Sequence, residues 1–325
     1  MRRILLTAAL LMAAGSAAGL DLQGHRGARG LLPENTLPAF ARALSIGIST
    51  LELDTAVTRD GVVVVSHDVT LNPDITRGPD GAWITRQDLA IHALTWRELQ
   101  TYNVGRIRQL TLYAQRFPEQ QPVDGAHIPR LTDVFALARR ADNATVRFNI
   151  ETKISPEHSG LTPSPEAFAR ALIGLIRREG LESRVTIQSF DWRTLQVVQK
   201  EAAEIATVYL TVQQSWLDNI RAGNSSSPWT AGFHVSNHGG SVPRMVKAAG
   251  GAVWSPHFAE LTRAQLQEAR QLGLKVVVWT VNDRADIARM IDWGVDGIIS
   301  DYPDRLRQIA AGRGLVLPPA TPVTP

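Results

Sequence analysis

The sequence has no cysteine in 325 residues. This absence excludes disulfide bonds, thiolate nucleophiles and zinc sites with thiolate ligands. It also excludes a lipid anchor attached to a cysteine. A folded state must therefore rest on a hydrophobic core, and 44% hydrophobic with 20% charged residues is typical of a globular protein that has one. The length allows one large domain or two small ones.

Long runs of one charge are also missing. The formal net charge is +3, and Arg2 and Arg3 at the amino terminus supply two of these charges. Because there is no basic run to follow a phosphate backbone, we expect no nucleic-acid partner. The oligomeric state stays open.

Long hydrophobic stretches are scarce as well. The stretch at residues 4–14 follows two arginines and precedes the small residues 15–18, which is the order found in a signal peptide. A membrane anchor is the competing interpretation, but the stretch is shorter than the ~20 residues that span a bilayer. We therefore predict a signal peptide at residues 1–18 and a periplasmic or secreted protein with no stable membrane anchor.

Short apolar runs alternate with amphipathic stretches along the rest of the chain. This alternation predicts a parallel sheet, and eight units that close on themselves predict an α/β fold of the TIM-type (β/α)8 barrel class. An open doubly wound sheet is less favoured because no glycine-rich phosphate loop follows the first run. The eight runs are residues 21–25, 50–55, 146–151, 185–188, 207–210, 252–255, 276–279 and 297–300. The amphipathic stretches are residues 36–46, 131–141, 165–178, 192–203, 262–272 and 283–293.

Two regions interrupt this rhythm. Residues 69–126 carry turn signals and apolar positions of their own, so we predict a small inserted subdomain after the second strand, over the barrel mouth. Residues 213–250 form a long connection, in which we expect a short strand at 233–235. The barrel is predicted to occupy residues 19–313, and the tail at 314–325, rich in proline and threonine, is expected to be disordered.

Two carboxylates share one face of the second predicted strand. Because strand residues alternate between faces, Leu51 and Leu53 face the outer helices while Glu52 and Asp54 face the barrel interior. Buried carboxylates need partners. A divalent cation is one partner, and an inward arginine or lysine is the other; this strand alone does not decide between them.

The third predicted strand favours the cation. Glu151 lies near its carboxyl end, where barrel enzymes keep their sites, and would join Glu52 and Asp54. Three oxygen ligands suit a hard cation, so we predict one bound Ca²⁺ or Mg²⁺. Lys153 follows on the same face, where its charge would bind an anionic substrate.

Two histidines lie at predicted strand ends. His25 ends the first run, and His67 follows a hairpin that turns at Asp60-Gly61. A histidine exchanges protons near neutral pH. A single histidine is more often structural, but two beside three carboxylates favour a catalytic role. Trp279 ends the seventh strand, where it would either contact the substrate or cap the barrel core.

An ordered set of motifs resembles the glycerophosphodiester phosphodiesterase family over about residues 22–310. The motifs are His25-Arg26-Gly27, Pro33-Glu34-Asn35-Thr36, Glu52-Leu53-Asp54, Asp60-Gly61 with His67-Asp68, Leu94-Thr95-Trp96-Arg97-Glu98-Leu99, Ile128-Pro129-Arg130-Leu131, Glu151-Thr152-Lys153, Ser189-Phe190, Trp279-Thr280-Val281-Asn282 and Asp296-Gly297 with Asp301-Tyr302-Pro303. Each motif alone is weak, but the order of the whole set is specific.

This resemblance implies a function. It implies hydrolysis of glycerophosphodiesters to sn-glycerol 3-phosphate and an alcohol, with a metal at Glu52, Asp54 and Glu151 and with His25 and His67 as the acid–base pair. Arg26, Lys153 and Trp279 are then candidate substrate-binding residues. Two alternatives remain: a lysophospholipid or sphingolipid phosphodiesterase of the same fold, and a non-catalytic periplasmic protein that binds glycerophosphodiesters.

Overall fold

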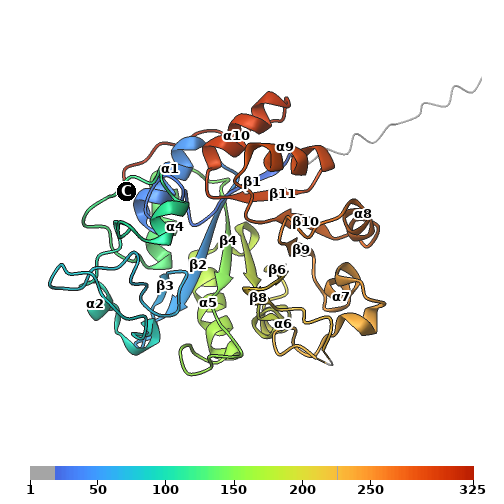
Figure 1. Ribbon diagram of the computed structural model, residues 1–325, viewed down its shortest axis with the longest axis horizontal. Helices are drawn as coiled ribbons and strands as arrows, with labels where there is room; N and C mark the ends of the chain where they lie inside the picture. Colours follow the sequence, from blue (N-terminus) through green and yellow to red (C-terminus); the bar gives the residue numbers. More distant parts are fainter. Residues whose placement is uncertain (1–18, 225) are drawn as a thin grey trace, which may run out of the picture.

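The computed structural model describes residues 19–224 and 226–325, so the predicted signal peptide lies outside the described residues. Across this described part, eight parallel strands form a closed barrel, because β1 pairs with both β11 and β2 (Figure 1). The predicted TIM-type barrel is therefore confirmed. Its strands are β1 (Asp21–Gly24), β2 (Thr50–Val57), β4 (Arg147–Thr152), β5 (Val185–Ser189), β6 (Ala206–Thr211), β9 (Val253–Pro256), β10 (Lys275–Val278) and β11 (Gly297–Ser300).

Helices surround the ring of strands in Figure 1. Each predicted amphipathic stretch forms a helix with bounds within two residues of the expectation, because capping residues mark the starts. Thr36 caps α1 and Ser164 caps α5, each accepting a hydrogen bond from a backbone N–H three residues on. The helices are α1 (Leu37–Ile46), α4 (Leu131–Arg140), α5 (Pro165–Glu179), α6 (Trp192–Glu201), α7 (Val242–Ala248), α8 (Arg263–Gln271), α9 (Arg284–Trp293) and α10 (Pro303–Gly312).

The main hydrophobic core lies between the strands and the outer helices. Leu51 and Leu53 of β2 and Phe148 and Ile150 of β4 belong to it, as their alternation predicts. Each fully buried side chain of this kind contributes about 1.5–3 kcal/mol relative to an exposed one. This burial fixes the register of β2 and leaves its alternate residues facing the barrel interior.

The barrel interior has an apolar side and a polar side. Four residues from β6, β9, β10 and β11 form a small apolar cluster: Val208, Val253, Val277 and Ile299. On the other side, Asn149 Nδ2 donates to Gln23 Oε1 and Gln188 Oε1, at 3.0 and 2.8 Å.

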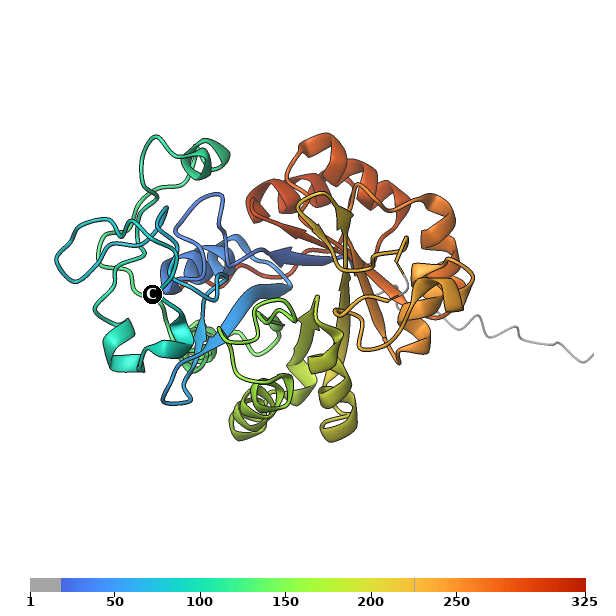
Figure 2. The same cartoon turned by 60° about the horizontal axis from the view of Figure 1, so that its bottom comes forward.

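The segment between β2 and α4 adds structure of its own beside the barrel. It begins with β3 (Val63–Val65), antiparallel to β2, and continues through η1 (Ile91–Ala93), α2 (Trp96–Leu99) and α3 (Leu112–Arg116). Leu71, Ile91, Leu99 and Val104 are members of its separate hydrophobic cluster. In Figure 2, α3 rises above the rest of this segment.

The long connection after β6 differs from the expectation. Its first part forms a hairpin of β7 (Gln213–Gln214) and β8 (Leu217–Asp218). The predicted strand at 233–235 is wrong, because a 3₁₀ helix, η3 (Val235–His238), starts there. His234 caps this helix by accepting from Ser236 N, and Gly239 ends it in the left-handed region. A second 3₁₀ helix, η2 (Glu182–Arg184), precedes β5.

The tail also differs from the expectation of disorder. Thr321 N donates to Leu44 O at 2.9 Å, and Arg307 Nη1 donates to Pro318 O at 2.7 Å. Leu317 and Val323 pack against the main core. The tail therefore lies along α1 and α10, because its few apolar side chains find a surface that the composition alone does not reveal.

In residues 19–224 and 226–325, none of the helices combines the length and the apolar character that crossing a membrane requires.

Candidate active site

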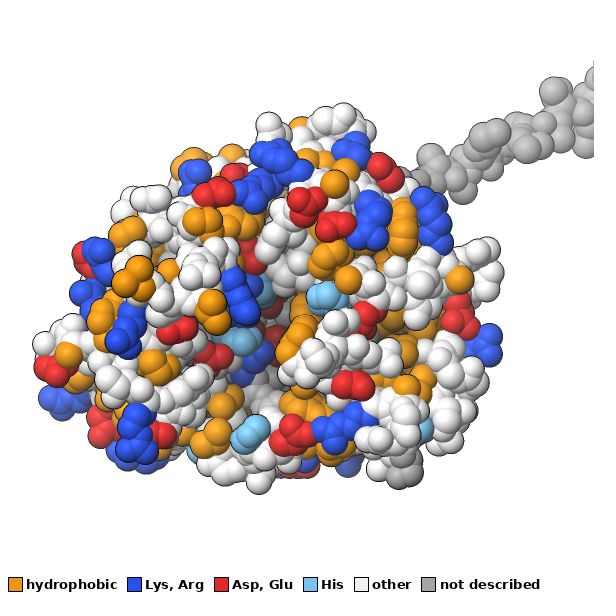
Figure 3. Space-filling model, in the orientation of Figure 1, with side chains coloured by type: hydrophobic (Ala, Val, Ile, Leu, Met, Phe, Trp, Pro, Cys, Tyr) orange, Lys and Arg blue, Asp and Glu red, His pale blue; other side chains and the backbone are white. Residues whose placement is uncertain are grey.

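A cavity of about 740 Å³ opens at the carboxyl ends of the barrel strands. Figure 3 shows it as a central hollow with histidine and charged side chains around and inside it. Seven of the predicted site residues line this cavity: His25, Arg26, Glu52, His67, Glu151, Lys153 and Trp279. The eighth, Asp54, is 1% exposed and lies among the acidic residues at the site.

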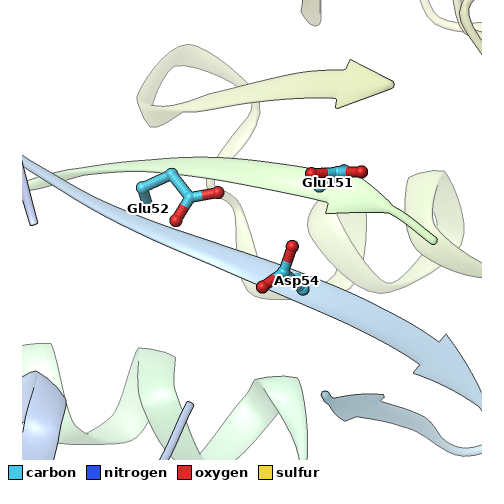
Figure 4. Close-up of side chains that lie close together, drawn as sticks. All are labelled: Glu52, Asp54 and Glu151. Atoms are coloured by element: carbon cyan, nitrogen blue, oxygen red, sulfur yellow. The ribbon is translucent and has the colours of Figure 1, made fainter. Parts of the chain in front are cut away.

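Glu52, Asp54 and Glu151 form a compact group. One carboxylate oxygen from each lies within 4.8 Å of the others. Asp54 on β2 pairs in register with Glu151 on β4, so both side chains leave the sheet at the same level and on the same face (Figure 4). All three are buried, as the period-two pattern predicts.

The charges around this group leave it short of positive partners. Arg26 Nε lies 3.2 Å from Asp54 Oδ2, and its Nη1 donates to Glu34 at 2.7 Å. Lys153 Nζ donates to Glu151 at 2.8 Å. Two cations therefore face four carboxylates in a buried setting, where unbalanced charge is costly.

The acidic group also contains an oxygen atom that is available to bind a cation. Asp54 Oδ1 is buried and accepts no hydrogen bond, and Lys153 Nζ is 3.8 Å from it, too far to donate one. A buried carboxylate oxygen without a donor fits a position beside a cation. The oxygen ligands and the charge deficit fit a divalent cation such as Ca²⁺ or Mg²⁺.

The pKa shifts follow from the same crowding. Burial raises the pKa of Glu52 well above its usual range, and the nearby charges of Asp54 and Glu151 add to the rise. Burial likewise raises the pKa of Glu151 to about 7, against the opposing charge of Lys153. Burial alone would also raise the pKa of Asp54, but the surrounding positive groups, Arg26 foremost and Lys153 among them, together outweigh it and lower that pKa. A divalent cation would hold all three groups ionised.

His25 lies where the first and last strands of the barrel meet. Its Nδ1 is 2.6 Å from Asp301 Oδ1, and its Nε2 is 3.9 Å from Glu52 Oε2. The Asp301 contact fixes the ring so that Nε2 faces the acidic group. Burial, together with the nearby Arg29 charge, lowers the pKa of His25 to about 4 despite the Asp301 carboxylate, so the ring is neutral at pH 7.

His67 is held by its neighbour in the sequence. Its Nδ1 lies 2.8 Å from Asp68 Oδ1, and Asn72 Nδ2 donates to the other oxygen of Asp68 at 2.7 Å. Burial and the Arg26 charge lower the pKa of His67. The two histidines thus have the same arrangement, with one nitrogen bound to a carboxylate and the ring at the cavity.

A strained turn after β1 aims the backbone of Arg26 into the site. Arg26 has φ of 49° and Gly27 has φ of 83°, both in the left-handed region. A Cβ on Gly27 would come within 2.7 Å of the Ala39 backbone, so only glycine fits there. The turn lets Arg26 N donate to Glu52 Oε2 at 2.9 Å.

Trp279 forms part of an aromatic side of the cavity. Its ring centroid lies 5.2 Å from that of Phe190, and its Nε1 donates to Ser255 O at 2.9 Å. The sequence left open whether Trp279 caps the core or reaches the mouth. It does both, because it contacts the interior apolar cluster and also lines the cavity.

Several residues at the site were not identified as site residues from the sequence. Asp301 was recognised only as part of a motif, although its position directly after β11 was a usable signal. Gln188 Nε2 donates to Glu52 Oε1 at 2.6 Å, and Asn35 Nδ2 donates to Asp54 Oδ2 at 3.0 Å. Trp216 and His257 line the cavity too. In the inserted segment, Trp83 and Tyr102 line a separate hollow, and Trp96 packs against that segment's own hydrophobic cluster.

Comparisons with known proteins show which family this chain belongs to. A model described as "Glycerophosphoryl diester phosphodiesterase family" matches residues 25–305. A glycerophosphodiester phosphodiesterase of Caldanaerobacter subterraneus is 29% identical, over 87% of this chain and 94% of that protein.

Solved structures agree. A crystal structure from Silicibacter pomeroyi, assigned as a glycerophosphoryl diester phosphodiesterase, has 35% identity and a TM-score of 0.80, with 93% of this chain and 96% of that chain covered. An Oleispira antarctica phosphodiesterase, solved with the product sn-glycerol-3-phosphate, shares the fold at 20% identity and a TM-score of 0.64, with 90% and 97% covered. The chain therefore belongs to the glycerophosphoryl diester phosphodiesterase family of enzymes.

Proposed function

We propose that this enzyme hydrolyses glycerophosphodiesters to sn-glycerol 3-phosphate and an alcohol, with a divalent cation and two histidines. The observation that carries the proposal is the meeting of three buried carboxylates, Glu52, Asp54 and Glu151, with His25 at 3.9 Å from Glu52 and His67 beside them at one cavity. The product complex of the Oleispira antarctica phosphodiesterase supports the choice of product.

Glu52, Asp54 and Glu151 would hold the cation, which we propose to be Ca²⁺ or Mg²⁺. When bound, it supplies Lewis-acid polarisation of a phosphoryl oxygen. Gln188 and the backbone N–H of Arg26 hold Glu52 by one hydrogen bond to each oxygen, so the carboxylate cannot turn away from the group. Asn35 Nδ2 holds Asp54 by its Oδ2 alone, and Oδ1 accepts no hydrogen bond.

The two histidines would move the protons. One neutral imidazole takes the proton from the attacking hydroxyl, and the other, once protonated, gives its proton to the departing alcohol. The attacking group is the glycerol 2-hydroxyl, which forms a cyclic phosphate that water then opens. Asp301 and Asp68 hold the two Nδ1 atoms, so that Nε2 of each ring is the atom left for this exchange.

Lys153 and Arg26 would neutralise the phosphoryl charge. Lys153 Nζ bonds to Glu151 and its side chain is 14% exposed, which leaves donor capacity toward the cavity. The Arg26 guanidinium is engaged with Glu34 and lies near Asp54, so its contribution is a fixed positive charge rather than a mobile clamp.

Product identity tests the function. Phosphorus NMR of a reaction with glycerophosphoethanolamine should show sn-glycerol 3-phosphate and no phosphoethanolamine. Lysophosphatidylcholine in a parallel reaction tests the lipid alternative, which predicts faster turnover of that substrate. Stoichiometric binding of glycerophosphoethanolamine without any product would instead support a binding protein and refute hydrolysis.

The amino-terminal pattern supports a further proposal, that the enzyme is exported to a periplasm or secreted. The mass of the protein recovered from that compartment tests it. A mass that corresponds to cleavage within two residues of Ala18 is expected, whereas a full-length protein confined to the cytoplasm contradicts it.

A further inference from the structure

Three aromatic rings on one side of the cavity stand nearly perpendicular to one another in every pair. The ring centroids of Trp216 and Trp279 are 6.2 Å apart at 80°, those of Trp216 and His257 are 6.2 Å apart at 72°, and those of His257 and Trp279 are 5.3 Å apart at 78°. Three such planes have the arrangement of three faces at the corner of a box. All three residues line the cavity, and we call them the aromatic corner.

The corner is built from three separate elements that are tied together. His257 follows β9 and Trp279 follows β10, and the two residues form a parallel β-bridge. Trp216 lies in the turn of the β7–β8 hairpin, and the neighbouring Leu217 of β8 lines the cavity as well. Glu260 fixes that hairpin, since its carboxylate accepts from Gln213 N at 2.9 Å and from Gln214 Nε2 at 2.7 Å.

The charges around the corner favour a cation. The faces of tryptophan rings carry negative potential, and among the described residues no lysine or arginine stacks on Trp216 or Trp279. Burial lowers the pKa of His257, which disfavours a positive charge on its ring, and the nearby Glu260 carboxylate opposes that shift. Trp216 keeps 61% of its surface exposed, which leaves area for a ligand to cover.

Phe190 connects the corner to the reacting end of the cavity. Lys153 Nζ lies 5.8 Å from the Phe190 centroid, and Phe190 lies 5.2 Å from Trp279. A phosphodiester held near Lys153 would therefore direct one of its two alcohol groups along Phe190 toward the corner. A compact cation with an apolar surface, at the end of a short chain, matches both the shape and the charge of this position.

We propose that Trp216, His257 and Trp279 bind a quaternary ammonium group on the leaving alcohol, so that choline-type phosphodiesters are the preferred substrates. This inference rests on the proposed hydrolysis of glycerophosphodiesters. It assigns Trp216 and His257 as specificity-determining residues, because they meet the alcohol rather than the phosphoryl group.

Three esters of glycerol phosphate test the assignment. They carry choline, ethanolamine, and 3,3-dimethylbutanol, in which carbon replaces the choline nitrogen. The wild-type kcat/KM for the choline ester should exceed that for each of the other two about 10-fold. The neutral dimethylbutyl ester lacks cation–π attraction to the tryptophans. The ethanolamine ester keeps the charge, but its primary ammonium is more strongly hydrated and lacks the methyl groups that would cover the rings. In Trp216→Leu the ratio of choline to ethanolamine ester should fall toward unity, mainly through KM for the choline ester. Trp83→Leu, in the inserted segment, is the matched control and should keep the wild-type ratio.

Three outcomes would overturn the inference: equal kcat/KM for the choline and ethanolamine esters, equal kcat/KM for the choline and dimethylbutyl esters, or an unchanged ratio in Trp216→Leu. Each of these leaves the hydrolysis itself intact, since all three esters would still be cleaved. Failure of the wild-type enzyme to cleave any of the three would refute the proposed function, and this inference with it.

Discussion

His25 Nδ1 and Asp301 Oδ1 lie 2.6 Å apart although 276 positions separate them in the sequence. The contact crosses the seam at which β11 pairs with β1 and closes the barrel. Arg29 binds the same carboxylate through two nitrogens, and Asn282 donates to it at 2.6 Å. Closure of the fold and orientation of a proposed proton carrier therefore depend on one aspartate.

Asp301→Asn should lower kcat by about 10²–10⁴ while the metal remains bound. The amide can donate to His25 Nδ1. This would favour the tautomer with its proton on Nε2, the nitrogen that should accept a proton. Steady-state kinetics with a metal-content measurement checks this. Asp286→Asn, on the surface of α9, is the matched control, and equal kcat in the two variants would contradict the positioning role.

His25→Ala and His67→Ala should each reduce kcat by about 10²–10⁴, because proton transfer to or from the reacting groups is lost. The acidic group stays complete in both variants, so bound metal should be unchanged. His127→Ala is the control, since that ring is exposed and bonds to a backbone carbonyl far from the cavity. Turnover at the wild-type rate in either site variant would exclude that histidine from the chemistry.

Acid should destabilise the protein partly through Asp301. The charges of Arg29 and His25 overcome the effect of burial and lower the pKa of Asp301 in the folded state. Stability gained from a lowered carboxyl pKa is complete above the unfolded value of about 4 and is lost as pH falls below it. Thermal unfolding should therefore give the wild type a higher Tm than Asp301→Asn at pH 6. The difference between the two Tm values should narrow toward pH 3. A difference in Tm that widens as the pH falls would contradict this prediction.

Deletion of residues 315–325 should destabilise the barrel. Leu317 and Val323 lose contact with the core, and the hydrogen bond from Thr321 N to Leu44 O is removed. Partial burial of these side chains is consistent with a loss of roughly 1–3 kcal/mol. Denaturant unfolding measures this loss of stability. Identical unfolding midpoints for the full and shortened chains would show that the tail contributes nothing, as its composition suggests.

The sequence predicts most of the barrel because its local patterns agree with the fold. The alternation of Glu52 and Asp54 with Leu51 and Leu53 identifies the inward face of β2, and the strand that carries Glu151 shows the same alternation. Thr36 and Ser164 are capping residues that any helix start would use. The acidic group, Lys153 and the two histidines could therefore be located from the alternation along strands and from the positions of strand ends.

The features that the sequence does not predict depend on contacts between segments that are far apart in the sequence. Nothing local in the sequence links Asp301 to His25, or the turn that carries Trp216 to Trp279 and His257. The expected strand at 233–235 failed because glycine follows His238 and a histidine cap at 234 favours a helical turn. The composition of the tail indicates flexibility and gives no sign that Leu317 and Val323 pack against the core.

The central claim is that Glu52, Asp54 and Glu151 hold one divalent cation that the reaction requires. The most direct test removes metal with EDTA, measures hydrolysis of glycerophosphoethanolamine, and then restores Ca²⁺ or Mg²⁺ while counting bound ions per chain. We expect activity to vanish and to return with a single ion in the wild type and in the surface control Glu166→Gln, but not in Glu52→Gln. Full turnover by metal-free protein, or an undiminished bound ion in Glu52→Gln, would contradict the account.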